Sequence, residues 1–234
     1  MDAFEEIAAP PAPKTLPSAS LLQAGPPIEP ISRLMVYTPD QWEEFIDEWV
    51  SGVLKAKYSS VRRFTGANDR GIDIAGFADA AMLSGEWDLY QCKRFQGSIA
   101  PGAAWPEIGK VLWHSFQGHY KAPRAYYFVA PKGVGTTLNQ LLAHAQNLKA
   151  RVKKEWDKNI AGAITGTTTI ALDGAFASYL DAFDFSIFKS ISPRELIDQH
   201  RGTPYFLSRF GGALPARPKP GGPPEDIQDH EQTY

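Results

Sequence analysis

The order of apolar patterns between residues 34 and 212 constrains the fold more than any other feature of this sequence. An apolar repeat of helical period follows a capping box made by Thr38 and Gln41. Strands alternating with helices come next, which predicts an α/β fold with a mixed β-sheet flanked by helices. The expected strands are residues 58–64, 72–77, 87–95 and 125–130, and the expected later helices are residues 105–121 and 136–159.

Proline-rich segments lie on both sides of this region. The first 32 residues contain seven prolines and little periodic hydrophobicity, which is typical of an N-terminal arm. Residues 33–212 would form one domain, and residues 213–234 a Pro/Gly-rich linker with the start of a truncated further region. Beyond residue 162 the hydrophobic pattern predicts secondary structure less clearly. Residues 164–172 suit a strand, and residues 175–200 are mostly helical in character.

Composition excludes several classes of protein. No apolar run approaches the ~18 residues that a membrane helix needs, and the acidic, proline-rich start resembles neither a secretory signal nor a transit peptide. The single cysteine, Cys92, excludes an internal disulfide and a zinc site of several cysteines, so the expected compartment is the cytoplasm. The net charge of −2 does not decide on nucleic-acid binding, because a local basic patch can coexist with acidic residues elsewhere.

Polar residues interrupt two neighbouring strands. Side chains alternate along a strand, so Gln91 and Lys93 share one face while Tyr90 and Cys92 share the other. The preceding strand contributes Asp73, and an acid buried there needs a partner or a metal ion to offset its desolvation. A hairpin between the two strands would place Asp73 beside Gln91 and Lys93.

Four acidic residues of the helix that follows Thr38 could each supply a further carboxylate ligand. At about 100° per residue, Glu43 lies roughly 90° from the centre of the apolar face, and Glu48 roughly 130°. Glu44 lies almost opposite that centre. A ligand must point inward from the edge of the buried face, which favours Glu43, with Glu48 as the alternative.

An acidic helix followed by Asp73 and the triplet Gln91-Cys92-Lys93 resembles the PD-(D/E)xK nuclease superfamily. More narrowly, GANDRGIDIAGF and WDLYQCKRF resemble its Mrr-like branch. The resemblance is closest over residues 42–95. The later segment SPRELIDQHRGTPYFLSRFGG is similar to effector nucleases of bacterial antiphage systems, of the three-component Lamassu type that works beside an SMC-like ABC ATPase.

The resemblance implies a restriction-endonuclease-like fold and a site for Mg²⁺ or Mn²⁺. Its ligands would be Asp73, the Gln91 amide oxygen, the backbone carbonyl of Cys92 and Glu43. Lys93 would position the attacking water and offset charge on the phosphate. With a glutamine in place of the second acid, metal binding should be weaker, and one-metal catalysis becomes more plausible than two-metal catalysis.

The same resemblance implies a metal-dependent endonuclease acting on double-stranded DNA, as an effector of antiphage defence. Its partners would be an SMC-like ATPase and a second copy of the chain. No association with a membrane is expected. Arginines that cluster around the site could bind phosphates: Arg62, Arg63, Arg70 and Arg94. The alternative is a catalytically inactive nuclease fold that binds nucleic acid or docks on the ATPase.

Three other features have simple structural interpretations. Asp69 suits a turn in which its side chain binds the local backbone. The thiol of Cys92 suits the back of its strand as a small apolar group rather than as a nucleophile. His114 and His119 lie five residues apart on an expected helix, and would therefore face different sides.

Overall fold

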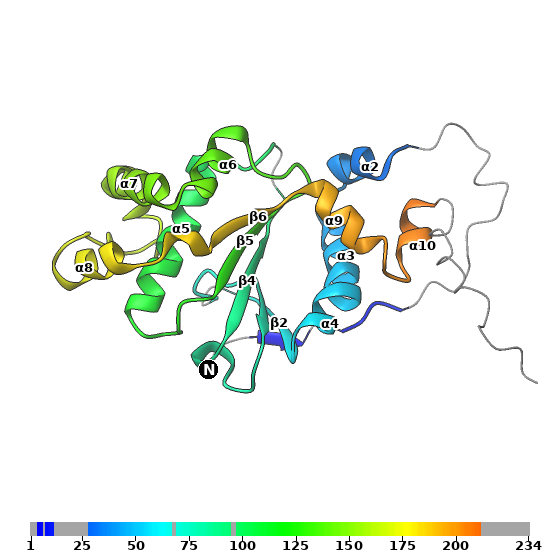
Figure 1. The fold of residues 1–234 in the computed structure, drawn as a ribbon, viewed down its shortest axis with the longest axis horizontal. Coiled ribbons are helices and arrows are strands. Elements are labelled where there is room, and N and C mark those ends of the chain that lie inside the picture. Colours follow the sequence, from blue (N-terminus) through cyan, green and yellow to red (C-terminus); the bar gives the residue numbers. More distant parts are fainter. Residues whose placement is uncertain (1–3, 7, 12–27, 67–68, 95–96, 212–234) are drawn as a thin grey trace, which may run out of the picture.

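The computed structural model describes residues 4–6, 8–11, 28–66, 69–94 and 97–211, which build one mixed β-sheet with helices on both faces (Figure 1). The α/β class expected from the sequence is therefore confirmed. Most of the expected arm and the region expected at residues 213–234 lie outside the described residues. None of the helices in the described part of the chain is long and apolar enough to cross a membrane.

Within the described ranges the sheet has six strands, which follow one another in chain order. The first four are antiparallel to their neighbours, which includes the expected hairpin, whereas the fifth and sixth run parallel to the fourth. The strand at the N-terminal edge falls within the segment expected as an arm. The strands are β1 (Phe4–Glu6), β2 (Ser60–Phe64), β3 (Ile74–Phe77), β4 (Trp87–Cys92), β5 (Ala125–Val129) and β6 (Phe188–Ile191).

One face of the sheet is covered by the helices between β4 and β6, which lie together on the same side in Figure 1. Trp87 and Leu89 of β4 point into this larger core. The elements on this side are α5 (Pro101–Phe116), α6 (Thr136–Ala143), α7 (Ala145–Glu155), η3 (Trp156–Ile160), α8 (Gly174–Ala182) and η4 (Phe185–Ile187), and a short η2 (Met82–Ser84) links β3 to β4.

The opposite face is covered by helices from both ends of the domain. Ile74 and Tyr90 point into this second core, which is built around Trp42, Phe45 and Trp49. The elements on this side are α2 (Pro30–Val36), α3 (Pro39–Trp49), η1 (Val50–Leu54), α4 (Lys55–Lys57), α9 (Pro193–His200) and α10 (Phe206–Phe210). The two cores together explain why β4 is buried on both of its faces.

The start of α3 is fixed by local chemistry, as the sequence predicts. The Gln41 N–H donates to Thr38 Oγ1 over 3.2 Å, and the Thr38 N–H donates to Gln41 Oε1 over 3.0 Å. This reciprocal capping box satisfies two N–H groups that the helix leaves unpaired. The helix can therefore begin at Pro39 and present its aromatic face to the sheet.

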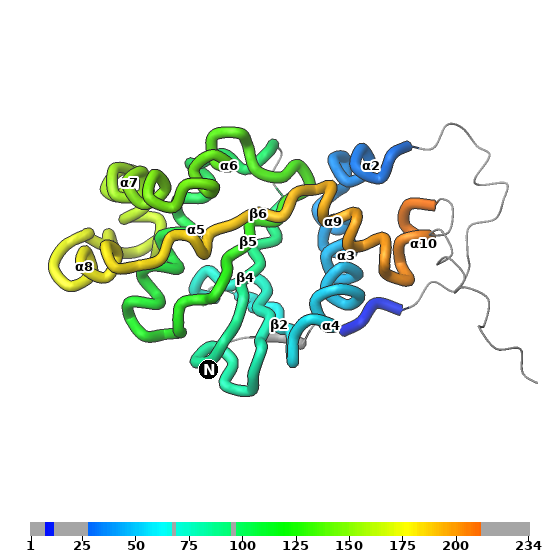
Figure 2. The backbone as a smooth tube through the Cα atoms, viewed as in Figure 1, coloured from blue at the N-terminus to red at the C-terminus, as the bar shows by residue number. Residues whose placement is uncertain are grey.

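Glu48 joins α3 to the C-terminal helices, which lie beside it although they are far away in sequence (Figure 2). Its carboxylate contacts His200 Nε2 at 2.8 Å and accepts from Arg209 Nε at 2.6 Å. His200 is fully buried and stacks on Phe45. This ion-paired cluster joins α3 to α9 and α10 within the second core.

The sequence-based prediction fails at two segments near the C-terminal end. Residues 164–172 form turns instead of a strand, because Thr165 Oγ1 donates to the Thr168 carbonyl and accepts from its N–H. The segment expected to be helical to residue 200 contains β6, whose four residues, Phe188–Ile191, are too few to show a clear period. The expected long helix is also divided, because His144 leaves the helical conformation between α6 and α7.

The two histidines near the end of α5 also depart from expectation. The helix ends at Phe116, and Gly118 adopts a positive φ of 69° that turns the chain back. His119 therefore returns to His114, with their Nδ1 atoms 3.1 Å apart. The prediction that they face different sides is wrong, because it assumed that the helix continued to residue 121.

Candidate active site

A pocket of about 380 Å³ lies where β4 ends and β3 begins. It is lined from three directions, by the first turn of α3, by the end of β2 with the following turn, and by the β3–β4 pair. The lining residues are Pro39, Trp42, Glu43, Phe64, Asp69, Asp73, Gln91, Cys92, Lys93 and Arg94. The structure thus brings together all four residues selected from the sequence as catalytic: Glu43, Asp73, Gln91 and Lys93.

Asp73 is anchored across the hairpin. The pairing of Ile74 with Tyr90 places it directly opposite Gln91, and its Oδ2 accepts the Cys92 N–H over 2.8 Å. Burial raises the pKa of Asp73, and the Cys92 N–H, Arg63 and Lys93 offset only part of that rise. The desolvated carboxylate is therefore a group that a bound cation would stabilise.

The two oxygen donors of the Gln91-Cys92 step already have partners. Gln91 is 4% exposed, and its Oε1 accepts from Tyr126 Oη at 3.3 Å. The Cys92 carbonyl accepts from the Trp42 indole at 3.1 Å. Each of these oxygens has a second lone pair, so neither contact removes all of its capacity to accept.

The alternation of side chains along β4 is as the sequence predicts. Gln91 meets Tyr126 of the larger core, and Lys93 reaches α5 on the same side. Tyr90 and Cys92 pack into the second core. Burial raises the pKa of the Cys92 thiol well above its usual range, which leaves it protonated and unsuited to act as a nucleophile.

The helical acids separate clearly. Glu43 is exposed and lines the pocket. The alternative, Glu48, faces the second core, where His200 and Arg209 occupy its carboxylate. Glu43 therefore lies at the pocket, whereas Glu48 joins α3 to the C-terminal helices.

The four arginines are distributed around the pocket rather than gathered in it. Arg94 is the one of the four that lines it, and its Nε donates to the Tyr37 carbonyl over 2.6 Å. Arg63 binds Asp47 of α3 at 2.7 Å and lies close enough to influence Asp73. The Arg62 side chain lies on the face of β2 opposite to Arg63, and Arg70 lies in the turn before β3.

The turn that precedes Asp73 is fastened to α5. Asp69 Oδ1 accepts the Gly71 N–H over 2.8 Å, which confirms the local role expected for that side chain. Gly71 has a φ of +80° and lies against Lys110, so closely that a Cβ there would come within 2.8 Å of the Lys110 Cβ. Tyr120 adds a hydrogen bond from its hydroxyl to the Arg70 carbonyl over 3.2 Å.

Glu107 of α5 also reaches this site, although it is not among the residues that the sequence pattern indicates. Glu107 is 6% exposed and forms an ion pair with Lys93, which is one of the residues that line the pocket. A signal was present, because Glu107 interrupts a helix face that Ala104, Ile108 and Val111 make apolar. Its partner could not be read from that pattern, since the contact depends on how α5 packs over β4.

The donors at the pocket suit a hard cation that keeps most of its water. Within the described residues no group of three or more His, Cys, Asp and Glu side chains lies close enough to share a metal ion. Asp73 and Glu43 offer carboxylates, and Gln91 and Cys92 offer neutral oxygens. Mg²⁺ is commonly held by one or two carboxylates with several waters, so this donor set fits Mg²⁺ or Mn²⁺ and argues against a closed cage.

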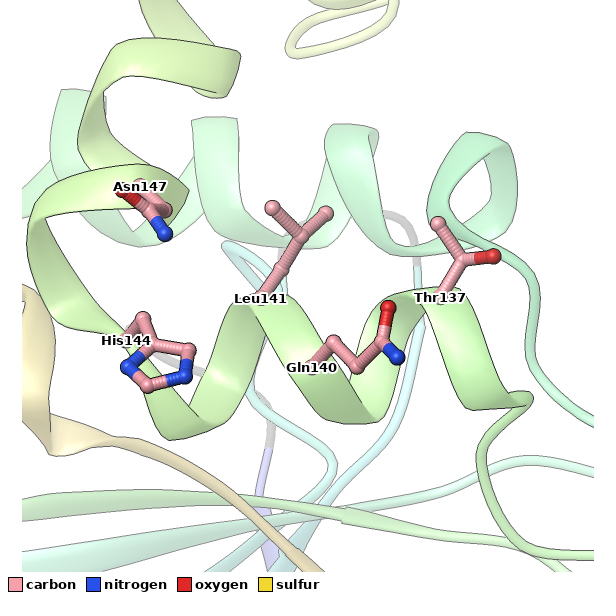
Figure 3. Close-up of a pocket in the computed structure, with 5 residues that line it drawn as sticks. All are labelled: Thr137, Gln140, Leu141, His144 and Asn147. Carbon is pink, nitrogen blue, oxygen red and sulfur yellow. The ribbon is translucent and has the colours of Figure 1, made fainter.

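Two other hollows lie away from these residues. Figure 3 shows one of about 350 Å³ at the break between α6 and α7, lined by Thr137, Gln140, Leu141, His144 and Asn147. Another, of about 380 Å³, lies between α6 and the edge strand β6. The lining of each contains a single basic group, His144 or Lys189, and no carboxylate among the described residues.

Comparison with protein-family models, with curated proteins and with solved structures found no match to this chain.

Proposed function

We propose that this chain is a metal-dependent endonuclease of the PD-(D/E)xK type that cuts double-stranded DNA, built on a restriction-endonuclease-like sheet. One observation carries the proposal. Glu43 from a helix, Asp73 from before one strand and Gln91 and Lys93 from the next line a single pocket. A short motif arises easily by chance in a sequence, but the motif here shares its pocket with a second acid, Glu43, which lies on a separate helix.

The roles follow from chemistry. Asp73 and Glu43, with the oxygens of Gln91 and Cys92, would hold Mg²⁺ or Mn²⁺, which supplies positive charge beside the scissile phosphate when bound. Lys93 positions the attacking water and offsets the charge that develops on the phosphate oxygens. The water oxygen forms a new P–O bond, an ester P–O bond breaks, and the leaving oxygen takes up a proton as an alcohol. Arg94 contacts a neighbouring phosphate.

The wider setting is proposed from the sequence resemblance. The nuclease would be the effector of an antiphage system, controlled by an SMC-like ATPase and active as an oligomer, since a break in both strands needs two sites. The alternative is a nuclease fold that binds nucleic acid without cutting it. The observation on the side of that alternative is that Tyr126 and Trp42 already donate to two of the expected ligand oxygens and leave each with one lone pair for a metal ion.

Supercoiled plasmid with Mg²⁺ or Mn²⁺ tests the proposal, using wild type and Asp73→Asn. Asparagine keeps an acceptor for the Cys92 N–H and removes the charge, so nicking should be lost while folding is retained. Asp181→Asn is the matched control, because Asp181 is an exposed partner of Lys153 on α7. Equal nicking by wild type and Asp73→Asn would refute the assigned site. Salt-sensitive DNA binding without nicking would support the inactive alternative.

A further inference from the structure

Glu107 is a buried carboxylate with two lysine partners. Its side chain is 8% exposed, and it forms an ion pair with Lys93 at the end of β4. Lys110, one turn later on α5, lies 3.4 Å from Oε1 and 3.3 Å from Oε2. A carboxylate removed from water in this way needs such partners, because an isolated buried charge is strongly destabilising.

The side chains of the two lysines differ in how tightly their surroundings hold them. The stem of Lys110 packs against Gly71, its backbone carbonyl accepts from Tyr120, and its side chain is 24% exposed. Lys93 follows the last residue of β4, lines the pocket and has a side chain that is 42% exposed. The Lys110 side chain is therefore held by its packing between α5 and the turn, whereas the more exposed Lys93 side chain has room to change its orientation.

Lys110 also lies near both carboxylate oxygens of Glu107, although farther away than Lys93, so a positive charge stays beside this carboxylate when Lys93 moves. The contact with Glu107 holds the Lys93 ammonium against α5 at the edge of the pocket.

We propose that Glu107 is a positioning residue, which aims the Lys93 ammonium at the scissile phosphate, with Lys110 as the cation that retains Glu107 when Lys93 turns to substrate. The inference rests on the proposed nuclease function and adds a residue that the motif does not contain. Glu107 itself touches neither substrate nor metal ion.

The first test is the kinetics of plasmid cleavage by Glu107→Gln, which removes the charge and keeps the shape. We expect kcat to fall about 10- to 100-fold, as is typical when a partner that orients a catalytic group is removed. The KM for DNA and the concentration of Mg²⁺ giving half-maximal rate should stay within about twofold. Glu86→Gln is the matched control, because Glu86 forms an exposed ion pair with Lys121 at the other end of β4.

The second test needs no nuclease activity. Brief labelling with acetic anhydride at one fixed pH, followed by mass spectrometry of the peptides, measures how firmly each lysine ammonium is held. Glu107→Gln should increase labelling of Lys93 several-fold and leave Lys121 unchanged. Glu86→Gln should do the reverse. Glu107→Asp keeps the charge on a shorter arm, so we expect an intermediate kcat and intermediate labelling, and it replaces Glu107→Gln if that variant does not fold.

Three results would overturn the inference. Unchanged kcat in a folded Glu107→Gln variant would show that Lys93 needs no such partner. Unchanged labelling of Lys93 would show that the ion pair does not hold the ammonium. A loss of Mg²⁺ affinity with normal labelling would make Glu107 a metal ligand. Failure of the proposed function gives a different pattern, in which wild type does not cut DNA and the labelling still reports the contact.

Discussion

The indole N–H of Trp42 donates to the backbone carbonyl of Cys92 over 3.1 Å and so ties α3 to the end of β4. Trp42 is 1% exposed and directly precedes Glu43. The hydrogen bond therefore fixes the rotation of the first turn of α3 relative to the strand, which turns Glu43 toward the pocket. It couples the acid from the helix to the residues from the hairpin.

Replacing Trp42 with Phe should lower both stability and cleavage. The free energy of unfolding should fall by about 1–3 kcal/mol, because the carbonyl loses its donor. Cleavage should also fall, since the first turn of α3 is no longer held against β4. Chemical denaturation and plasmid nicking measure the two effects.

Trp87→Phe provides the matched control for that experiment. The Trp87 indole makes the same kind of hydrogen bond, to the Lys121 carbonyl over 2.8 Å, but at the opposite end of β4. We expect a similar loss of stability and unchanged cleavage per folded molecule. Equal loss of cleavage in both variants would mean that the Trp42 contact has no specific role in the site.

The two adjacent glutamates of α3 should differ in their effect on activity. Glu43→Gln should reduce cleavage by at least about 10-fold at low Mg²⁺, and excess Mg²⁺ should restore part of the loss, because a ligand charge has been removed. Glu44→Gln is the control, since Glu44 is exposed and lies 3.4 Å from Arg209 rather than at the pocket. Rates as a function of Mg²⁺ concentration separate the two, and identical curves would exclude Glu43 as a ligand.

Glu48 should make the fold sensitive to acid. Burial would raise the pKa of Glu48, but hydrogen bonds with His200 and Arg209 outweigh it and hold that pKa below its usual range. A carboxyl with a lowered folded pKa contributes stability that is present above its unfolded value of about 4.3 and is lost as pH falls through the folded pKa. Melting temperature should therefore drop steeply below about pH 4.3.

Glu48→Gln tests this assignment. At neutral pH the variant should be less stable by about 1.5–3 kcal/mol, since Arg209 loses a charged acceptor. Wild type and variant should converge as pH falls, because both then lack the carboxylate charge. A difference that stays constant down to pH 2 would show that the lowered pKa of Glu48 is not the cause.

The sequence predicted those parts of the fold that depend on local chemistry. The capping box places the start of α3 at Pro39, and the period of two places Gln91 of β4 and Lys93, just after it, on one side of the sheet. The angle around α3 similarly separates Glu43 from Glu48. Each of these depends on geometry within one element, which the chain carries with it before any tertiary contact forms.

The parts that the sequence did not predict depend on contacts between elements. Glu107 meets Lys93 because α5 crosses over the end of β4, and no pattern within α5 encodes that crossing. The strand β6 has four residues and needs β5 beside it to be stable as a strand. The division between α6 and α7 at His144 has no glycine or proline to announce it.

Gly71 gives a prediction about the turn that carries Asp73. Gly71→Ala should destabilise the fold and reduce cleavage, for two separable reasons. A φ of +80° costs about 1–2 kcal/mol for a residue with a side chain. The new methyl group would also lie 2.8 Å from Lys110 Cβ, so either the turn or Lys110 must move. Denaturation and plasmid cleavage together measure the change.

Gly66→Ala separates the two causes. Gly66 lies at the other end of the connection between β2 and β3 with a φ of +101°, and no atom of the part of the chain that the structure describes lies within 4 Å of a Cβ built there. Its variant should carry the backbone strain alone and keep its cleavage rate, because neither Lys110 nor Asp73 is displaced. The difference between the two variants then measures the contact with Lys110. Equal kcat for both would mean that the packing of this turn on α5 does not control the position of Asp73 or the Lys93–Glu107 pair.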